Sequence, residues 1–362
     1  MIKYVLIGAG RIAKNHVLSV KENEYDLIFS GICDVELSNI ERCLESADYK
    51  KDVNKYTDYK QMINEISPDF VAIATSSGSH AQIAKYCLEH NCNVLIEKPI
   101  AMSIRDAQML IDIAKEKNLI LGACHQNRFN KSVQKLYVAL KEGRFGKISH
   151  MAAHVRWNRN EDYYKQATWR GKWAEDGGCL MNQCIHNADL LCWLLGDIEQ
   201  VFAYTNNAMH PYIEGEDLGM ALIKAKSGAY AIFEGTVNVY PQNLEETLYV
   251  FGEKGTVKLA GKSVNLIEEW NFADEKDDKE KIKEIASEMP VNIYGFGHKR
   301  IYADFIQSIK TNGEHKLLVD GEAGKRALEL ILAMYKSKKI GKPVNLPLDD
   351  FSSMDMYGIF DR

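Results

Sequence analysis

The stretch that decides the fold lies at the start of the chain and reads Ile2-Lys-Tyr-Val-Leu-Ile7-Gly8-Ala-Gly10-Arg11-Ile12-Ala13. Its first six residues form a short apolar run that suits a buried parallel strand. The glycines that follow, with alanine in the third place, match the pattern that binds a dinucleotide between a strand and a helix. Gly8 permits the tight turn, and Gly10 lets the backbone approach a pyrophosphate. We expect the turn to bind the cofactor through Gly8, Gly10, Arg11 and Ile12.

A second apolar strand, at residues 27–33, ends in Asp34. An acid in this place accepts hydrogen bonds from the adenine ribose and repels a 2′-phosphate, so it favours NAD over NADP. The alternative is that Asp34 caps the helix that follows it. Further strands and helices then alternate up to residue 123, which predicts a doubly wound Rossmann domain over residues 1–123. The predicted strands are 69–75, 93–96 and 119–123, and the predicted helices are 59–65, 81–90 and 104–117.

Two of these strands end in polar loops. One carries Thr75, Ser76 and His80, and the other reads Glu97-Lys98-Pro99. Ligands of open α/β sheets bind at the carboxyl ends of the strands, so we expect both loops to contact the cofactor. Proline biases Lys98 towards an extended backbone, which helps to aim its side chain. The alternative for Glu97 and Lys98 is an ordinary surface ion pair.

From residue 124 onwards the pattern changes to long alternating segments typical of antiparallel strands. Two pairs of them are joined by tight turns, at 226–228 and 252–255, and read as hairpins. The sequence therefore predicts a second α/β domain over residues 124–362, with a large, mostly antiparallel, open-faced sheet. Its charged stretch at 273–286 is expected to be a mobile excursion. The predicted strands are 148–157, 201–207, 218–226, 229–240, 247–251 and 256–259.

A second informative stretch reads Asp176-Gly-Gly-Cys-Leu-Met-Asn182-Gln183-Cys-Ile-His186-Asn-Ala-Asp189-Leu-Leu-Cys-Trp193. A glycine pair precedes about four turns of helix-compatible sequence, on which Asn182, His186 and Asp189 fall within roughly 60° of one another. A polar row on an otherwise apolar helix must find partners, because an unsatisfied buried polar group is costly. His186 is therefore either a core histidine satisfied by Asp189 or a titratable group in a functional site.

Composition narrows the classes of function. The chain has 362 residues, 46% of them hydrophobic, and a formal net charge of -5, which argues against a nucleic-acid or anionic-membrane surface. The first residues read as a strand, so we expect no signal peptide, and without an apolar run of 18 residues we expect no transmembrane helix. The eight cysteines show no repeated metal-ligand spacing and are expected to be reduced thiols of a cytoplasmic protein. We predict no metal, since Cys184 would point away from the row that contains His186.

Arginines and aromatic residues gather shortly before the glycine pair. Aromatic faces pack on sugar rings, and arginines bind carboxylate or pyrophosphate in a bidentate way. The alternative is that the aromatic residues belong to the core or to an interface between subunits. We expect substrate contacts from Arg128, Arg156, Trp169 and Arg170, and a cofactor contact from Gln126, which with Arg128 stands at the domain boundary.

The motifs recur in an order that we recognise: Gly8-x-Gly10-x-x-Ala13, the loop ending in His80, Glu97-Lys98-Pro99, and Gly177-Gly178…His186-x-x-Asp189. In this the chain resembles the Gfo/Idh/MocA oxidoreductases over essentially its whole length. The resemblance implies that Lys98 hydrogen-bonds the reacting oxygen and that His186 is the acid/base. The family often has aspartate where Asn182 stands. This departure puts an Asp–His dyad in doubt, and it leaves Asn182 to hold substrate hydroxyls and Asp189 as an orienter. We also expect Gln183, His186 and Asp189 to contact the substrate.

The resemblance also implies a function. It predicts NAD-dependent hydride transfer at a hydroxyl carbon of a sugar, in a homodimer or homotetramer built through the C-terminal sheet. The block around Arg156–Trp173 and the run from Asn182 through Gln183 to His186 resemble the subgroup that oxidises UDP-N-acetylglucosamine or its uronic acid at C3. The alternatives are an inositol or free-sugar dehydrogenase, an NAD-recycling hydrolase or lyase, and a non-catalytic NAD-binding regulator.

Overall fold

The computed structural model describes residues 1–274, 276–288 and 297–361. They form two compact units, each with a sheet of its own. The first contains Met1–Cys124 and His298–Lys325, and the second contains His125–Gly297 and Arg326–Arg362.

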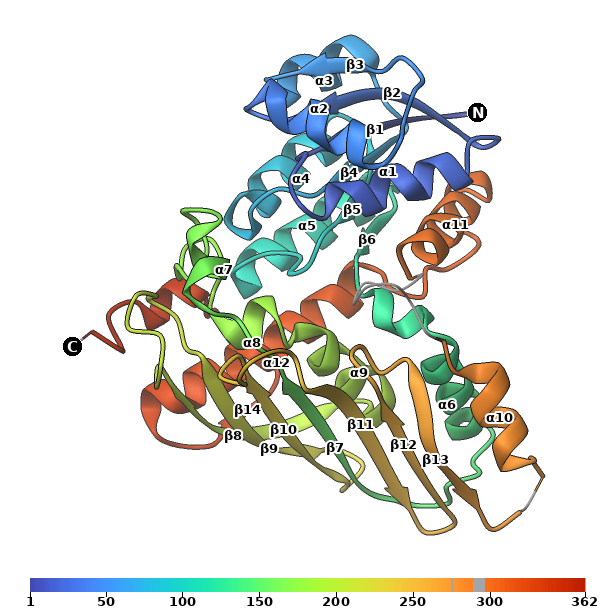
Figure 1. Ribbon diagram of the computed structural model, residues 1–362, viewed down its shortest axis with the longest axis vertical. Helices are drawn as coiled ribbons and strands as arrows, with labels where there is room; N and C mark the ends of the chain where they lie inside the picture. The colour runs from blue at the N-terminus through green and yellow to red at the C-terminus, as the bar shows by residue number, and fades with distance from the viewer. Residues whose placement is uncertain (275, 289–296, 362) are drawn as a thin grey trace. The chain divides into compact units, whose positions relative to one another are not determined.

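The sheet of the first unit has six strands, all parallel, in the order β3-β2-β1-β4-β5-β6 (Figure 1). The strand order reverses between β1 and β4, and the glycine-rich turn follows β1 at this switch point. The predicted Rossmann sheet is thereby confirmed. The strands are β1 Ile2–Ile7, β2 Leu27–Cys33, β3 Asn54–Tyr56, β4 Phe70–Ile73, β5 Asn93–Ile96 and β6 Leu121–Ala123.

Helices pack on this sheet because its strands are apolar on both faces; β4, for example, is buried throughout. One of them, α11, comes from far along the sequence, and its Phe305 stacks on Phe70 with ring centroids 4.5 Å apart. Residues 298–325 thus pack with the first unit, so the compact units differ from the continuous division at residue 123/124. As functional domains, 1–123 and 124–362 stay a prediction. The helices of this unit are α1 Ala13–Glu22, α2 Leu37–Ser46, α3 Tyr59–Ile66, α4 His80–Glu89, α5 Ile104–Glu116 and α11 Gly297–Lys310.

The second unit is built on an eight-stranded sheet in the order β13-β12-β11-β7-β10-β9-β8-β14. Only the pair β7–β10 is parallel, so the predicted antiparallel character and both hairpins are confirmed. The strands are β7 Ile148–Arg156, β8 Ile198–Asn206, β9 Leu218–Ala225, β10 Tyr230–Thr236, β11 Glu245–Gly252, β12 Gly255–Ala260, β13 Leu266–Phe272 and β14 Val344–Asn345.

Helices α8 (Cys179–Asn182) and α9 (Ile185–Leu195) lie along one face of this sheet (Figure 1). Their close approach requires glycine in the strands below: a β-carbon on Gly219 or Gly235 would lie 2.5 or 2.6 Å from the side chain of Leu180. Exposed apolar side chains occur on β8, β9 and β10, among them Tyr204, Met220, Leu222, Tyr230 and Ile232. Assembly through this sheet stays a prediction.

Two expectations for this unit are wrong. The predicted continuous helix is interrupted at Gln183 and Cys184, between α8 and α9. The charged stretch is not an irregular excursion throughout, because residues 279–286 form α10, capped by Asp278 and anchored by buried Ile282 and Ala286. Within the described residues no helix has the length and apolar character needed to cross a membrane. The other helices are α6 Lys131–Lys141, α7 Glu161–Lys165, α10 Lys279–Ala286 and α12 Gly321–Ile340.

Candidate functional site

The turn after β1 has the geometry that a dinucleotide requires. Gly8 has φ +97°, and a β-carbon there would lie 2.5 Å from the carbonyl group of Ala74, so only glycine fits. At Gly10 a β-carbon would meet nothing within 4 Å, which leaves room beside the backbone. No side chain caps the start of α1 at Ile12, so N–H groups at this helix end can bind an anion. These features fit a pyrophosphate.

Asp34 ties this turn to the next helix. Its Oδ2 accepts a hydrogen bond from the Ala9 N–H at 2.8 Å, and its Oδ1 accepts from the Glu36 N–H at 3.0 Å and the Asn39 amide at 2.8 Å. The residue at the N-cap of α2 is Glu36, so Asp34 supports the helix start without being its cap. An ionised carboxylate offers about four acceptor positions, and one is therefore left for a ribose hydroxyl.

The loop after β4 is held by His80, whose ring is buried at the start of α4. Its Nδ1 lies 2.8 Å from the Pro99 carbonyl oxygen and its Nε2 lies 3.2 Å from that of Thr75. Burial lowers the pKa of His80, although both contacts oppose the shift. His80 thus joins the two loops in which we expect the cofactor contacts of Thr75 and Ser76. A cofactor contact of its own stays a prediction.

The loop after β5 carries Glu97 and Lys98. Glu97 is only 5% exposed, so the alternative of a surface ion pair is wrong. Its Oε1 lies 3.2 Å from His16 Nε2 and 2.9 Å from His298 Nε2, and its Oε2 accepts the Lys98 N–H at 3.2 Å. The carboxylate therefore has an internal role, and a cofactor contact through it stays a prediction. Lys98 itself is partly exposed.

In the second unit, Asn182 and His186 have separate partners. The Asn182 amide donates to Asp176 Oδ1, and its own Oδ1 accepts from Gln183 Nε2 at 2.6 Å. His186 Nε2 lies 3.3 Å from Gln126 Nε2. Asp176 is thus an acid beside Asn182 that the sequence did not point to, although it stands directly before the glycine pair. Gln126 lies next to the proposed acid/base, and its expected cofactor contact stays a prediction.

Asp189 pairs with Arg128 rather than with His186. Arg128 Nε and Nη2 donate to the two carboxylate oxygens at 2.8 and 2.6 Å, and the pair is 4% and 0% exposed. The guanidinium also stacks over Trp193, 5.0 Å from its ring. Asp189 thus has a charged partner other than His186, and its role as the orienter of His186 stays a prediction. This geometry also gives no support to the predicted substrate contacts of Arg128 and Asp189.

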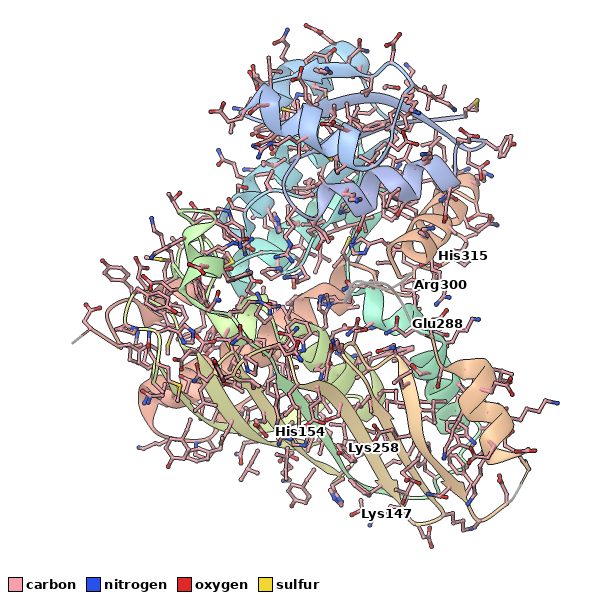
Figure 2. All side chains as sticks on the ribbon, viewed as in Figure 1. Lys147, His154, Lys258, Glu288, Arg300 and His315 are labelled. Carbon is pink, nitrogen blue, oxygen red and sulfur yellow. The ribbon has the colours of Figure 1, made fainter. Side chains whose placement is uncertain are left out.

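Arg156, expected to bind substrate, is neutralised on the sheet. It donates from Nε to Glu234 at 2.9 Å and from Nη1 to Glu245 at 2.5 Å, and these hydrogen bonds raise its pKa although burial opposes the shift. His154, labelled with Lys258 in Figure 2, contacts Glu234 as well. Arg156 thus has a cross-strand structural role, and its predicted substrate contact gains no support.

Arg159 and Arg170 both pack against the ring of Tyr163. Arg159 Cζ lies 5.0 Å from the ring of Tyr163 and Arg170 Cζ lies 4.2 Å from it, while Trp157 and Trp169 flank them at 4.9 and 4.7 Å. Arg159 donates to Gln183 Oε1 at 3.0 Å, and Gln183 Nε2 donates to the Tyr163 hydroxyl at 3.0 Å. In the described part of the chain no carboxylate lies within 4.0 Å of either guanidinium. We call Arg159, Tyr163 and Arg170 the arginine pair site.

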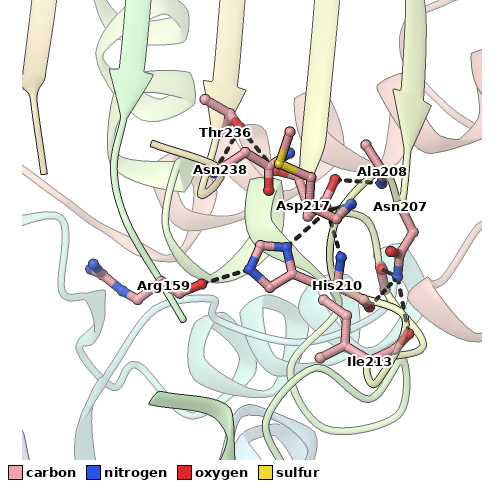
Figure 3. A network of polar contacts seen from close by, with 10 residues as sticks. Arg159, Asn207, Ala208, His210, Ile213, Asp217, Thr236 and Asn238 are labelled. Carbon is pink, nitrogen blue, oxygen red and sulfur yellow. Dashed lines mark hydrogen bonds and ion pairs between the residues drawn. The ribbon is translucent and has the colours of Figure 1, made fainter. Parts of the chain in front are cut away.

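The backbone of Arg159 is anchored by a buried network (Figure 3). His210 Nε2 lies 2.6 Å from the Arg159 carbonyl oxygen and its Nδ1 lies 2.9 Å from Asp217. Asp217 also accepts the N–H groups of Ala208 and Met209, at 2.9 and 2.7 Å. Burial lowers the pKa of His210, but its hydrogen bonds to Asp217 and to the Arg159 carbonyl group outweigh burial and raise the pKa overall. The Arg159 side chain points away from this network, towards Gln183.

These features define an enzyme class: a Rossmann domain fitted to a dinucleotide, joined in one chain to an antiparallel α/β unit with a buried histidine and a cationic site. Residues 2–125 match the oxidoreductase family with an NAD-binding Rossmann fold, and residues 133–258 match the GFO/IDH/MocA C-terminal domain. The chain belongs to the GFO/IDH/MocA family of oxidoreductases, and its cofactor is NAD.

Solved structures agree with this assignment. The WlbA dehydrogenase from Bordetella pertussis, in complex with NADH and UDP-GlcNAcA, is 34% identical with a TM-score of 0.87, and the match covers 96% of this chain and 98% of that one. The WlbA enzyme from Chromobacterium violaceum is 35% identical with the same TM-score, with 96% of each chain covered. A myo-inositol 2-dehydrogenase from Thermotoga maritima is 25% identical, with 94% of this chain and 97% of the other covered.

Proposed function

We propose that this protein is an NAD-dependent dehydrogenase that oxidises the C3 hydroxyl of a nucleotide-linked amino sugar, UDP-N-acetylglucosamine or its uronic acid. The observation that carries this proposal is the arginine pair site. Two guanidinium groups stack on Tyr163, next to Gln183 and Asn182, with neutral hydrogen-bond partners. Like charges this close are stabilised by an anion, and a diphosphate or a uronate carboxylate supplies one.

The alternative substrates lack this anion. Inositol and free hexoses are neutral, so an inositol dehydrogenase would have no use for two adjacent guanidinium groups. The WlbA relatives, at 34% and 35% identity, were solved with UDP-GlcNAcA, which carries both a diphosphate and a carboxylate. The curated inositol dehydrogenase relative is more distant, at 25% identity. Both the cationic site and the comparison therefore favour the nucleotide sugar.

The proposed reaction assigns a role to each of His186, Lys98 and Asn182. NAD, when bound, would supply the hydride acceptor for the carbon that is oxidised. His186 takes the hydroxyl proton, since an imidazole has its pKa near the working pH, and the Gln126 amide lies beside its ring. The Lys98 ammonium stabilises the oxygen as negative charge develops on it. Asn182, held by Asp176, binds a neighbouring hydroxyl.

The first experiment is NADH formation at near-stoichiometric enzyme, with UDP-N-acetylglucosaminuronic acid, UDP-N-acetylglucosamine, myo-inositol and glucose. We expect a signal with a UDP-sugar that disappears in Lys98→Ala and in His186→Ala. A signal with inositol or glucose alone would overturn the proposal. Cleavage of a sugar without net NADH formation would instead support an NAD-recycling hydrolase.

The arginine pair site has its own test. Arg159→Met and Arg170→Met should each raise the KM for the UDP-sugar at least tenfold, since charge-assisted hydrogen bonds contribute roughly 1.5–3 kcal/mol each. Lys172→Met is the matched control, because Lys172 is an exposed cation of the same segment. An equal rise of the KM in all three variants would show that it depends on the positive charge of the whole segment and not on the arginine pair site. Comparing the KM for the two UDP-sugars then shows whether the site binds the diphosphate or the carboxylate. If the KM rises only for the uronic acid, the site binds the carboxylate.

A further inference from the structure

Four buried side chains of the first unit meet beside the backbone that leads to Lys98. They are His16 of α1, Glu97 after β5, Cys124 after β6 and His298 of α11, with exposures of 0%, 5%, 0% and 4%. One ligand atom from each lies within 4.8 Å of all the others. The proposed reaction uses none of these groups directly, and the chain nevertheless buries them together.

The hydrogen bonds of this cluster run in one direction. An ionised carboxylate only accepts, so His16 Nε2 and His298 Nε2 both donate to Glu97 Oε1, at 3.2 and 2.9 Å. His16 Nδ1 lies 2.7 Å from the Tyr302 hydroxyl, which lies 2.6 Å from that of Tyr4. Burial lowers the pKa of His16, and a neutral His16 accepts from Tyr302, which in turn accepts from Tyr4. The chain of donors therefore ends on Glu97.

These donors keep Glu97 ionised. Burial by itself raises the pKa of a carboxyl group, but the bonds from His16 and His298 outweigh it and hold the pKa of Glu97 well below its usual range. The second oxygen accepts the N–H of Lys98 at 3.2 Å. Both carboxylate oxygens are thus held, one by the imidazoles and one by the peptide that precedes the Lys98 side chain. The ionisable groups around Glu97 are Tyr4, His16, His80, Lys98, Cys124, His298 and Tyr302.

We propose that His16 and His298 form a clamp on Glu97 that positions Lys98. The hydrogen bond to the Lys98 N–H fixes its backbone, and the negative charge on the preceding residue stabilises its ammonium group. His298 is thus a positioning residue, supplied by a helix some 200 positions further along the chain. The inference does not depend on which sugar is the substrate. It goes beyond the proposed function because it concerns how Lys98 is held.

The same four residue types also suit a zinc ion. We favour a cluster held by hydrogen bonds over a zinc site, because bonds of ordinary length already join Glu97 to both imidazoles. In addition, Tyr302 supplies the donor that a neutral His16 needs. Metal analysis of the purified protein distinguishes the zinc site from the hydrogen-bonded clamp. About one equivalent of zinc that survives dialysis and is lost in Cys124→Ser would overturn the clamp of hydrogen bonds.

The main test measures the pKa of the Lys98 amine without any substrate, by competitive acetylation over a series of pH values with mass-spectrometric readout. Glu97→Gln should lower this pKa by about one unit, as the loss of a neighbouring opposite charge does. His298→Leu should lower it by less, because the carboxylate keeps its bonds from His16 and from the Lys98 N–H. His298→Gln, which retains a donor, should recover most of the wild-type value.

A second readout is turnover with the sugar found active. His298→Leu should lower kcat about tenfold through misplacement of Lys98, with little change in the Kd for NAD. His315→Leu is the control, since His315, labelled in Figure 2, is exposed and bonds Asp304 outside the cluster. An unchanged Lys98 pKa in Glu97→Gln would overturn the proposal. So would His298 variants that lose thermal stability and NAD binding while kcat and the Lys98 pKa stay the same.

Discussion

The carboxyl group of Glu216 fills the space that a β-carbon on Gly178 would need, since that atom would lie 1.9 Å from Glu216 Oε2. Gly178 has φ +89° and directly precedes α8, the helix that carries Asn182. Glu216 is fully buried and accepts the Leu180 N–H at 2.7 Å and the Tyr335 hydroxyl at 2.8 Å. The glycine before the predicted helix is therefore required for packing, and not only for a flexible turn.

Gly178→Ala should lower the free energy of unfolding by on the order of 3 kcal/mol, through both the clash and the backbone conformation. Gly228→Ala is the matched control. Gly228 has a similar φ of +86°, but a β-carbon there would meet nothing within 4 Å, so only the strain of about 1 kcal/mol applies. Urea unfolding of both variants measures the difference. Equal losses would show that Glu216 moves aside at no cost.

Glu216 should also make stability depend on pH. Burial raises the pKa of Glu216 from 4.5 to about 8, although its hydrogen bonds oppose the shift. The folded protein thus keeps a proton that the unfolded chain releases, so stability falls as pH rises from about 4.5 and levels off above about 8. Glu216→Gln removes this contribution. The melting temperature of the variant minus that of the wild type should therefore increase as pH rises from about 4.5 to about 8. A difference that stays constant over this range would contradict the raised pKa of Glu216.

The sequence was most informative where structure depends on neighbours in the chain. The turn at Gly8 and the hairpin turns are local, and each was predicted from a few adjacent residues. The interruption at Gln183 was not predicted, because the residues on both sides are compatible with helix. The packing of α8 likewise depends on the space left by Gly219 and Gly235, two strand residues far from it in sequence.

Partners distant in sequence were the main source of error at the site. Asp189 is three positions from His186, which suggested a contact, but its partner Arg128 lies 61 positions earlier. Arg156 and Arg159 looked alike in one basic, aromatic block. Arg156 ends β7 and forms ion pairs with Glu234 and Glu245, whereas Arg159 lies beyond the strand and meets Tyr163. Spacing alone does not reveal which arginine is neutralised.

The charge of Asp34 should set the preference for NAD. Asp34→Asn keeps a similar shape and removes the charge that would repel a 2′-phosphate. We expect the ratio of the Kd for NADP to that for NAD to fall roughly tenfold. Cofactor titration followed by protein fluorescence measures both constants. A lower Kd for NADP than for NAD in the wild type would refute this role of Asp34, and Asp52→Asn, at an exposed aspartate of the same unit, is the control.

The pair of Arg128 and Asp189 should contribute strongly to the free energy of unfolding and affect kcat only indirectly. The pair is bidentate and buried, so Asp189→Asn leaves a buried guanidinium without its counter-charge, at a cost of about 3–5 kcal/mol in the free energy of unfolding. Glu199→Gln, in the exposed pair with Lys224 at 2.8 Å, should leave stability nearly unchanged. Replacing both buried partners, in Arg128→Met with Asp189→Leu, should recover much of the loss, because neither charge is then left alone. Since both carboxylate oxygens of Asp189 accept from Arg128, the double variant should also keep the pH profile of kcat, whereas a shifted acid limb would make Asp189 the orienter of His186.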